Sequence, residues 1–211
     1  MISFDENRLI EFGEVSFDVP IPPVSLQANR SRKAVIKNTI RSLLKSSNYI
    51  ITGDVSIFIE WYIHEQLRYE SDISPDIDNI LKPILDALCG PEGLIIDDCQ
   101  VQAIDCRWID VTTTLQTINI SIKNLNGHYQ KKDGLIFLQF ENNLCFPLNS
   151  NLPDKFIKDF IIYCQDAYQH RDRILEKTRD YYSANCIMPD LRPFHSTRLR
   201  NFKIVDIREY F

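Results

Sequence analysis

The chain has 211 residues, 44 % of them hydrophobic, and a formal net charge of −5 at pH 7. This length fits one large domain or one small domain with an extension, and the apolar share excludes a globally disordered chain. No apolar run approaches the roughly 20 residues that a membrane span needs. The start, Met1 to Arg8, is acidic and polar, unlike a signal peptide. We therefore expect a cytoplasmic protein with no membrane partner.

The first half of the chain predicts a strand, a helix and a second strand. Residues 15–19 alternate apolar and polar side chains, which is typical of a strand, and Pro20 ends it. Residues 34–44 have a loose helical spacing of apolar side chains. Residues 54–64 place an apolar side chain at every second position and form the clearest predicted strand. Residues 67–75 are a polar connection.

The next segment predicts a short helix and three short strands. Residues 79–88 have an apolar stripe at helical spacing, and residues 90–93 form a turn by composition. Residues 94–96 are an apolar run that predicts a buried strand. Residues 101–108 and 115–123 predict two strands joined by a turn.

The residue pattern changes after residue 123. Residues 124–134 are polar and predict a linker, residues 135–140 predict a strand, and a long helical pattern begins near Pro153. We place one domain at 1–126 and an extension of unknown role at 127–211. The expected fold is α/β (α+β), a small mixed sheet with flanking helices, followed by a mainly helical C-terminal extension.

The six cysteines and four histidines are scattered along the chain, and no cysteines form a C-x-x-C pair. This spacing gives little support for a structural zinc site. Free, reduced thiols in a reducing compartment are the simpler interpretation.

The distribution of charge is more informative than its sum. Acidic residues crowd between Glu60 and Asp110, and basic residues crowd on either side of that segment. Carboxylates that hold a metal, flanked by basic arms that hold phosphates, suit an enzyme that cleaves nucleic acid, although two ordinary solvated faces would give the same pattern. The candidate phosphate-binding residues are Arg30, Arg32, Lys33, Lys37, Arg41 and Lys45. A weaker basic group contains Arg192, Arg198, Arg200, Lys203 and Arg208.

Two pairs of aspartates form the candidate chemical centre. Asp76 and Asp78 are two residues apart, so in extended backbone their carboxylates point the same way. We expect Asp78 or Asn79 to cap the following helix, and we expect Pro83, which is tolerated near a first turn, to keep the aspartates in the loop before it. Lys82 follows Asp78 by four residues and would lie at the same edge of the helix start.

The second pair, Asp97 and Asp98, follows an apolar run. Three or four carboxylates in one cleft repel one another unless a cation is bound. Oxygen ligands of this kind select Mg²⁺ or Mn²⁺ over zinc, and such a metal can polarise a phosphodiester and activate water. Helix capping by the first pair and a solvated turn at the second remain the alternative interpretation.

The ordered pattern D-x-D-N-x-x-K-x-x-x-D-A-L, a Gly turn, an apolar run and D-D-x-Q-V resembles the RusA family of Holliday junction resolvases. The matching residues are Asp76, Asp78, Asn79, Lys82, Asp86, Ala87, Leu88, Asp97, Asp98, Gln100 and Val101. The resemblance covers about residues 15–123, so the remaining residues are a departure from the family pattern.

The resemblance implies a Mg²⁺-dependent endodeoxyribonuclease, with Mn²⁺ as a substitute, that acts as a homodimer and makes paired nicks across a four-way DNA junction in recombination and repair. By carry-over, Asp76, Asp78 and Asp98 would be metal ligands, with Asp97 as a further candidate, and Lys82 would be the catalytic lysine. We expect Asp86 to pair with Lys82 on the helix surface.

Two alternatives to junction resolution stay open. The extension allows a nuclease that acts on flaps, forks or invading phage DNA. The other alternative is a non-catalytic module that binds branched DNA. Such a module would have a broken metal cluster, whereas the aspartates of the motif are all present in this sequence.

Overall fold

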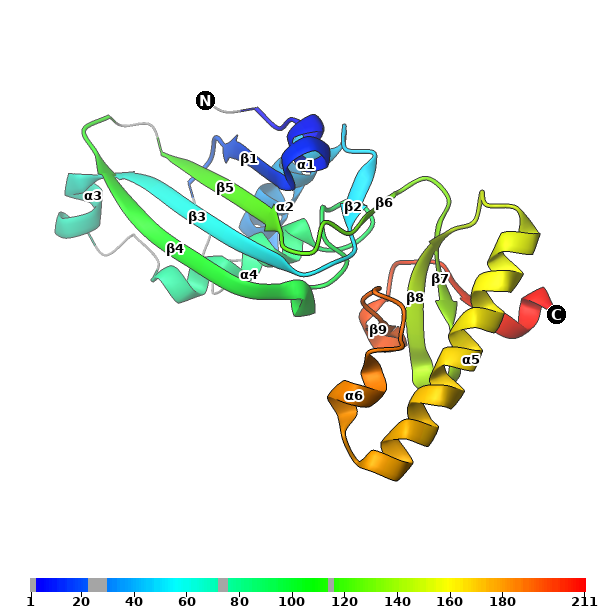
Figure 1. The fold of residues 1–211 in the computed structure, drawn as a ribbon. Coiled ribbons are helices and arrows are strands. Elements are labelled where there is room, and N and C mark those ends of the chain that lie inside the picture. Colours follow the sequence, from blue (N-terminus) through cyan, green and yellow to red (C-terminus); the bar gives the residue numbers. More distant parts are fainter. Residues whose placement is uncertain (1–2, 23–29, 72–75, 114–115) are drawn as a thin grey trace. The chain divides into compact units, whose positions relative to one another are not determined.

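The computed structural model describes residues 3–22, 30–71, 76–113 and 116–211 (Figure 1). Its internal contacts divide the chain into two compact units, Met1–Lys132 and Asp133–Phe211. Both units combine helices with strands, which confirms the predicted mixed fold class.

Unit 1 is built on a four-stranded mixed sheet with the strand order β1-β5-β3-β4. The strands are β1 (Glu14–Val19), β3 (Val55–His64), β4 (Val101–Val111) and β5 (Thr117–Asn124). Strand β5 runs antiparallel to both β1 and β3, whereas β4 is parallel to β3. The strands predicted on either side of the turn near Asp110 are therefore not neighbours, since β3 lies between them. Leu115, the first residue of the predicted strand, lies outside the described residues.

Helices α2 (Arg30–Leu44) and α4 (Ile77–Leu88) lie on one face of this sheet (Figure 1). The alternation seen in the sequence explains this arrangement, because Val55, Ile57 and Ile59 of β3 are fully buried and Ser56 between them is not. Together with side chains from α1 (Glu6–Phe12), α2, α4, β1 and β5, they form the larger hydrophobic core.

Two very short strands were not predicted. Strand β2 (Tyr49–Ile51) pairs antiparallel with β6 (Tyr129–Lys131), which lies in the predicted linker. The rings of Tyr49 and Tyr129 meet edge to face, with centroids 5.5 Å apart. The first few residues after Asn126 therefore belong to unit 1. The predicted polar connection at 67–75 is also partly wrong, because α3 (Glu65–Glu70) occupies its start; residues 72–75 lie outside the description.

The apolar run at 94–96 is buried as predicted, but it is not a strand. Ile95 forms only isolated bridges with Ile51 and Cys89. The backbone N–H groups of Leu94 and Ile95 both donate to the Leu88 carbonyl at the end of α4, so the run folds back over that helix. A side chain at Gly93 would place its Cβ 1.9 Å from the Leu88 carbonyl oxygen, which explains the glycine.

Unit 2 has its own sheet, with the order β10-β7-β8-β9, and its own core. The predicted strand is β7 (Leu135–Gln139), and the predicted long helix is α5 (Asp154–Thr178). This helix ends before Tyr182 because Arg179 adopts a left-handed conformation with φ of 54°. The remaining elements are β8 (Leu144–Asn149), α6 (Tyr181–Asn185), β9 (Phe194–His195), β10 (Ile204–Asp206) and the 3₁₀ turns η2 (Glu141–Asn143), η3 (Ser196–Arg198) and η4 (Ile207–Tyr210).

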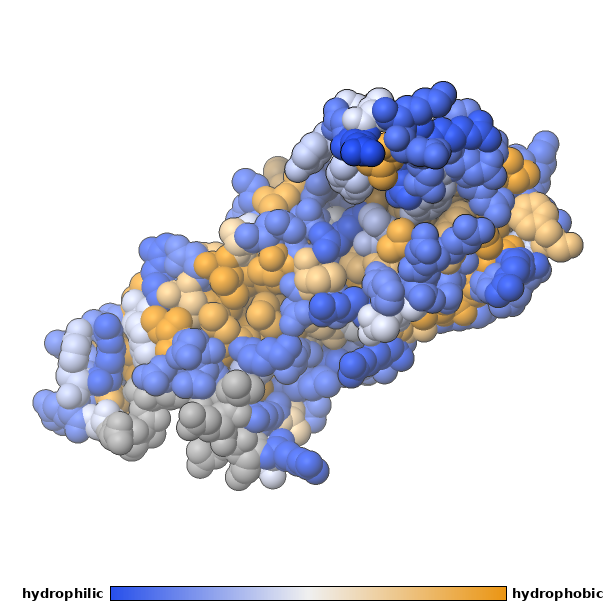
Figure 2. Space-filling view, turned by 90° about the horizontal axis from the view of Figure 1, so that it is seen from below, coloured by the Kyte–Doolittle hydropathy of each residue, from blue (hydrophilic) through white to orange (hydrophobic). Residues whose placement is uncertain are grey.

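On the face shown in Figure 2, hydrophilic side chains surround a stretch of hydrophobic ones. The exposed hydrophobic residues include Phe12 and Leu67 in unit 1 and Phe156 and Tyr182 in unit 2. Within the ranges that the structure covers, none of the helices combines the length and the apolar character needed to span a membrane.

Candidate active site

The first aspartate pair lies at the start of α4. Asp76 is the N-cap residue, with extended backbone, and Asp78 lies inside the first turn. The prediction that Asp78 or Asn79 caps the helix was therefore wrong by two or three residues. The Asp76 side chain makes no capping hydrogen bond; instead, the Asn79 N–H donates to the Asp76 carbonyl at 3.1 Å. Both side chains are exposed, so their carboxylate oxygens are open to solvent.

Pro83 does not limit the helix in the predicted way. It lies inside α4, beyond the first turn, and it is buried. A proline at this position lacks the N–H that would bond to the Asn79 carbonyl, and its burial offsets part of that loss. Ile80 anchors the first part of the helix, because it packs in a small buried cluster with Trp61 and Ile63 of β3. Packing against β3 therefore holds the start of α4, and Asp78 with it.

The second aspartate pair forms a tight turn before β4. Asp97 caps the 3₁₀ turn η1 (Asp98–Gln100), and its carboxylate accepts the Cys99 N–H at 3.0 Å. Asp97 thus has the capping role that was the alternative interpretation for the first pair. The Asp98 side chain contacts Lys82 and is 33 % exposed.

Lys82 joins the second pair to α4. Its ammonium group donates to Asp98 Oδ2 at 2.9 Å and lies 2.9 Å from Asp86 Oδ1. The Asp86 contact confirms the predicted pairing one turn apart on the helix surface. Hydrogen bonds with Asp86 and Asp98 raise the pKa of Lys82 above its ordinary value, although burial opposes this shift. The lysine is therefore cationic throughout the physiological range of pH.

The structure brings only part of the predicted cluster together. Lys82 is in direct contact with both Asp86 and Asp98. In the described part of the chain, no three His, Cys, Asp or Glu side chains are grouped so that they could hold a metal ion. The donor chemistry nevertheless fits Mg²⁺, because Asp76, Asp78 and Asp98 offer carboxylate oxygens that are at least partly exposed. Lys82 supplies the positive charge beside Asp98 in this arrangement.

Helix α2 presents the candidate phosphate-binding residues. Lys33 and Lys37 are partly exposed and lie four residues apart on one face. Arg41, one turn further on, instead forms an ion pair with Glu92 and reaches the Cys89 carbonyl at 3.5 Å. It therefore links α2 to the turn after α4. Arg30 is exposed at the start of the helix, and the side chain of Arg32 lies outside the description.

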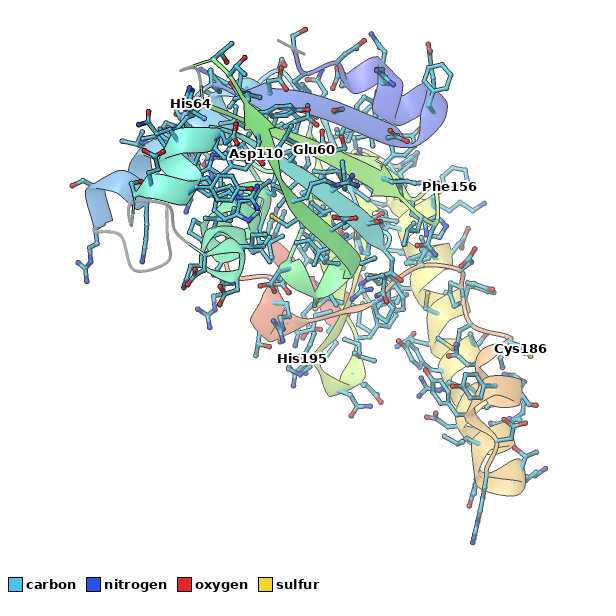
Figure 3. The ribbon with its side chains drawn as sticks, turned by 90° about the vertical axis from the view of Figure 1, so that its left-hand side faces the viewer. Glu60, His64, Asp110, Phe156, Cys186 and His195 are labelled. Carbon is cyan, nitrogen blue, oxygen red and sulfur yellow. The ribbon has the colours of Figure 1, made fainter. Side chains whose placement is uncertain are left out.

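A second group of polar contacts, at the end of β4 opposite the Asp98 turn, was not identified from the sequence. Asp110 lies on β4 at the end of the strand pair where β3 ends in His64 (Figure 3). Both oxygens of Asp110 accept hydrogen bonds from Arg68 of α3, at 2.8 and 2.9 Å. The Arg68 guanidinium also lies over the rings of Tyr69 and Trp108. These contacts fix α3, which precedes the segment that leads to Asp76.

Gln100 is the other residue whose role the sequence did not reveal. It belongs to the D-D-x-Q-V motif, but a glutamine in a motif carries no indication of burial. Its side chain is fully buried and hydrogen-bonded to the backbone on two sides. It is thus part of the framework of the Asp97–Asp98 turn.

A comparison with known protein families identifies the same segment of the chain. The model of the family described as Endodeoxyribonuclease RusA matches residues 26–123. The match contains both aspartate pairs, Lys82, Gln100 and the whole of α2. Among curated proteins, no sequence matches the chain. Residues beyond 123, including all of unit 2, lie outside the match. Over residues 26–123 the chain is therefore similar to the RusA family of endodeoxyribonucleases.

Proposed function

We propose that this chain is a Mg²⁺-dependent, structure-selective endodeoxyribonuclease that resolves Holliday junctions by paired nicks in recombination and repair. The observation that carries the proposal is the contact of Lys82 on α4 with Asp98 in the turn before β4. It joins two separate parts of the family motif at one place, with carboxylate oxygens and a cation both partly exposed to a substrate.

Each site residue has a distinct role in this proposal. Asp76, Asp78 and Asp98 hold the metal, with Asp97 nearby as the cap of the turn. The bound metal would polarise the phosphodiester and lower the pKa of a water molecule. Lys82 is held by Asp86 and Asp98, so its charge stays at the site and can stabilise the negative charge that develops on the phosphate. Mn²⁺ should substitute for Mg²⁺, because both accept carboxylate ligands.

Helix α2 would bind DNA backbone. Lys33 and Lys37, with Arg30 at the start of the helix, present positive charge to solvent, and phosphate contacts by such residues fix position without reading sequence, which suits a structure-selective enzyme. We also propose a homodimer, because a two-fold protein places two equivalent active sites on the opposed strands of a two-fold junction.

The direct test is incubation of the purified chain with a labelled four-way junction and a linear duplex of the same arms. The proposal predicts paired nicks in the junction with Mg²⁺, none with EDTA, and little cleavage of the duplex. Equal cleavage of both substrates would remove the structure-selective part of the proposal.

A second candidate substrate class is motivated by unit 2, a compact unit that the family match does not include. An added unit of this size would suit a nuclease that acts on flaps, forks or foreign DNA. Cleavage of flaps or forks at least ten times faster than of the four-way junction would favour this class over junction resolution.

A further inference from the structure

We infer that Gln100 is a positioning residue that fixes the carboxylate of Asp98, and with it the contact to Lys82, against the frame of the sheet. The inference rests on the proposed function, since it concerns the same metal and lysine site.

The Gln100 side chain uses its full hydrogen-bonding capacity within the protein. Its carbonyl oxygen accepts the backbone N–H of Ile96 at 2.6 Å and that of Asp97 at 3.1 Å. Its amide nitrogen donates to the carbonyls of Ile51 at 3.0 Å and Gly53 at 2.6 Å. A primary amide offers two acceptor sites and two donors, so all four are satisfied, and the residue is 0 % exposed.

The two carbonyls that Gln100 binds belong to a rigid part of unit 1. Ile51 is the last residue of β2, and Gly53 lies in the connection to β3. The N–H groups of Thr52 and Gly53 both donate to the His128 carbonyl. The Ile51 N–H donates to the Leu94 carbonyl at 2.8 Å. Gln100 therefore connects the Asp97–Asp98 turn to backbone that also forms hydrogen bonds with the carbonyls of His128 and Leu94.

The other end of the side chain holds the backbone immediately before Asp98. Ile96 and Asp97 are restrained by Gln100, and Asp97 in turn accepts the Cys99 N–H. Asp98 is thus flanked by fixed backbone on both sides, which defines where its carboxylate meets Lys82. Residues that orient a ligand carboxylate change metal affinity or activity by about 10 to 100-fold when they are replaced.

The test compares Gln100→Met with Gln102→Met in the full chain. Methionine keeps the volume of glutamine but removes all four hydrogen bonds, and Gln102 is an exposed control two residues along β4. The measurements are Mn²⁺ affinity without DNA, junction affinity without metal, and the cleavage rate over a range of Mg²⁺ concentrations.

We expect Gln100→Met to weaken Mn²⁺ binding by about 10 to 100-fold and to lower cleavage, with partial recovery at high Mg²⁺. Junction affinity without metal should stay at the wild-type value, because the basic residues of α2 are untouched. Gln102→Met should match the wild type throughout. A residue that only stabilises the fold would lower the melting temperature without shifting the metal dependence, and this result would overturn the inference.

A second variant covers the case in which Gln100→Met does not fold. Gln100→Glu keeps an oxygen for the N–H groups of Ile96 and Asp97 but places another against the carbonyls of Ile51 and Gly53. It should also shift the metal dependence, and wild-type metal dependence in a folded Gln100→Glu protein would overturn the inference. Failure of the proposed function is distinct, because the wild type itself would then leave the junction intact at every Mg²⁺ concentration.

Discussion

Lys82 joins the two parts of the motif. Because its ion pairs are exposed, effects of Lys82 on stability can be distinguished from effects on activity. Its side chain is 47 % exposed, and the side chains of Asp86 and Asp98 are 53 % and 33 % exposed. Ion pairs this accessible contribute only about 0.2 to 1 kcal/mol to folding. The position of Lys82 is therefore explained better by a role on a substrate than by a role in stability.

Replacement of Lys82 by Met should reveal this separation. We expect the free energy of unfolding to change by less than about 1 kcal/mol, because the ion pairs are exposed. Cleavage should fall by about 100-fold or more, since a charge that stabilises the transition state is lost. The measurements are denaturant unfolding and junction cleavage, with Lys123→Met on β5 as an exposed control. A Lys82→Met protein that cleaves at the wild-type rate would exclude the catalytic role.

The cysteines allow an independent check of the burial pattern at the residue scale. Burial raises the pKa of Cys145 to about 11 and that of Cys164 to about 12, whereas Cys186 is exposed. The thiolate is the form that reacts with a disulfide reagent, so a raised pKa slows labelling near pH 8. Among the three cysteines of unit 2, we expect Cys186 to be labelled first and Cys145 and Cys164 later, as measured by peptide mass mapping. Early labelling of Cys164 would contradict the packing of α5 in unit 2.

At the scale of elements, α2 offers the clearest test of DNA binding. The double replacement Lys33→Gln and Lys37→Gln should weaken junction binding without metal and make its dependence on salt less steep by about two units, one for each lost phosphate contact. The same change at Lys155 and Lys177, two exposed lysines of α5, serves as the control. Equal losses in both double variants would indicate diffuse attraction between protein and DNA.

The sequence predicted those helices and strands whose apolar side chains repeat regularly over many residues. Strand β3 was predicted because its buried side chains alternate over ten residues, and α5 because its apolar spacing continues over 25 residues. Strands β2 and β6 have three residues each, which is too short for a periodic signal, and they pair across a long stretch of sequence. Their pairing is a tertiary property that local patterns do not express.

The candidate site, too, has features that local sequence patterns identified and features that depend on distant parts of the chain. The residue types and their spacing were sufficient to single out Asp76, Asp78, Lys82 and Asp98, and the structure adds the contact between the last two. The start of α4 was misplaced because Pro83 was taken as a mark of the first turn, whereas it is buried inside the helix. The role of Gln100 depends on the carbonyls of residues far away in the sequence, so no local pattern could have revealed it.

At the scale of the whole molecule, the question is where the nuclease part of the chain ends. The sequence predicted a boundary at Asn126, but strand β6 follows that residue and pairs with β2. The His128 carbonyl also accepts hydrogen bonds from Thr52 and Gly53, next to the carbonyls that Gln100 binds. A chain that ends at Asn126 would lack these contacts, whereas one that ends at Lys132 would keep them.

Two truncated proteins test this boundary. Residues 1–132 should fold alone and retain nuclease activity, because unit 1 contains both aspartate pairs and its own core. Residues 1–126 should be less stable by roughly 2 kcal/mol or more, since several backbone hydrogen bonds, each worth about 1 kcal/mol, are lost with the edge-to-face tyrosine contact. Denaturant unfolding measures the difference. Equal stability of the two proteins would place the boundary at Asn126, as the sequence predicted.

The most direct test of the central claim is cleavage of a synthetic four-way junction by the wild type and by Asp78→Asn, each with Mg²⁺. This replacement removes the charge of one proposed metal ligand and leaves the basic face of α2 intact. Asp78 is exposed, so the fold should be unaffected. We predict paired nicks by the wild type, none by Asp78→Asn, and equal junction binding by both. Cleavage by Asp78→Asn at the wild-type rate would contradict the account.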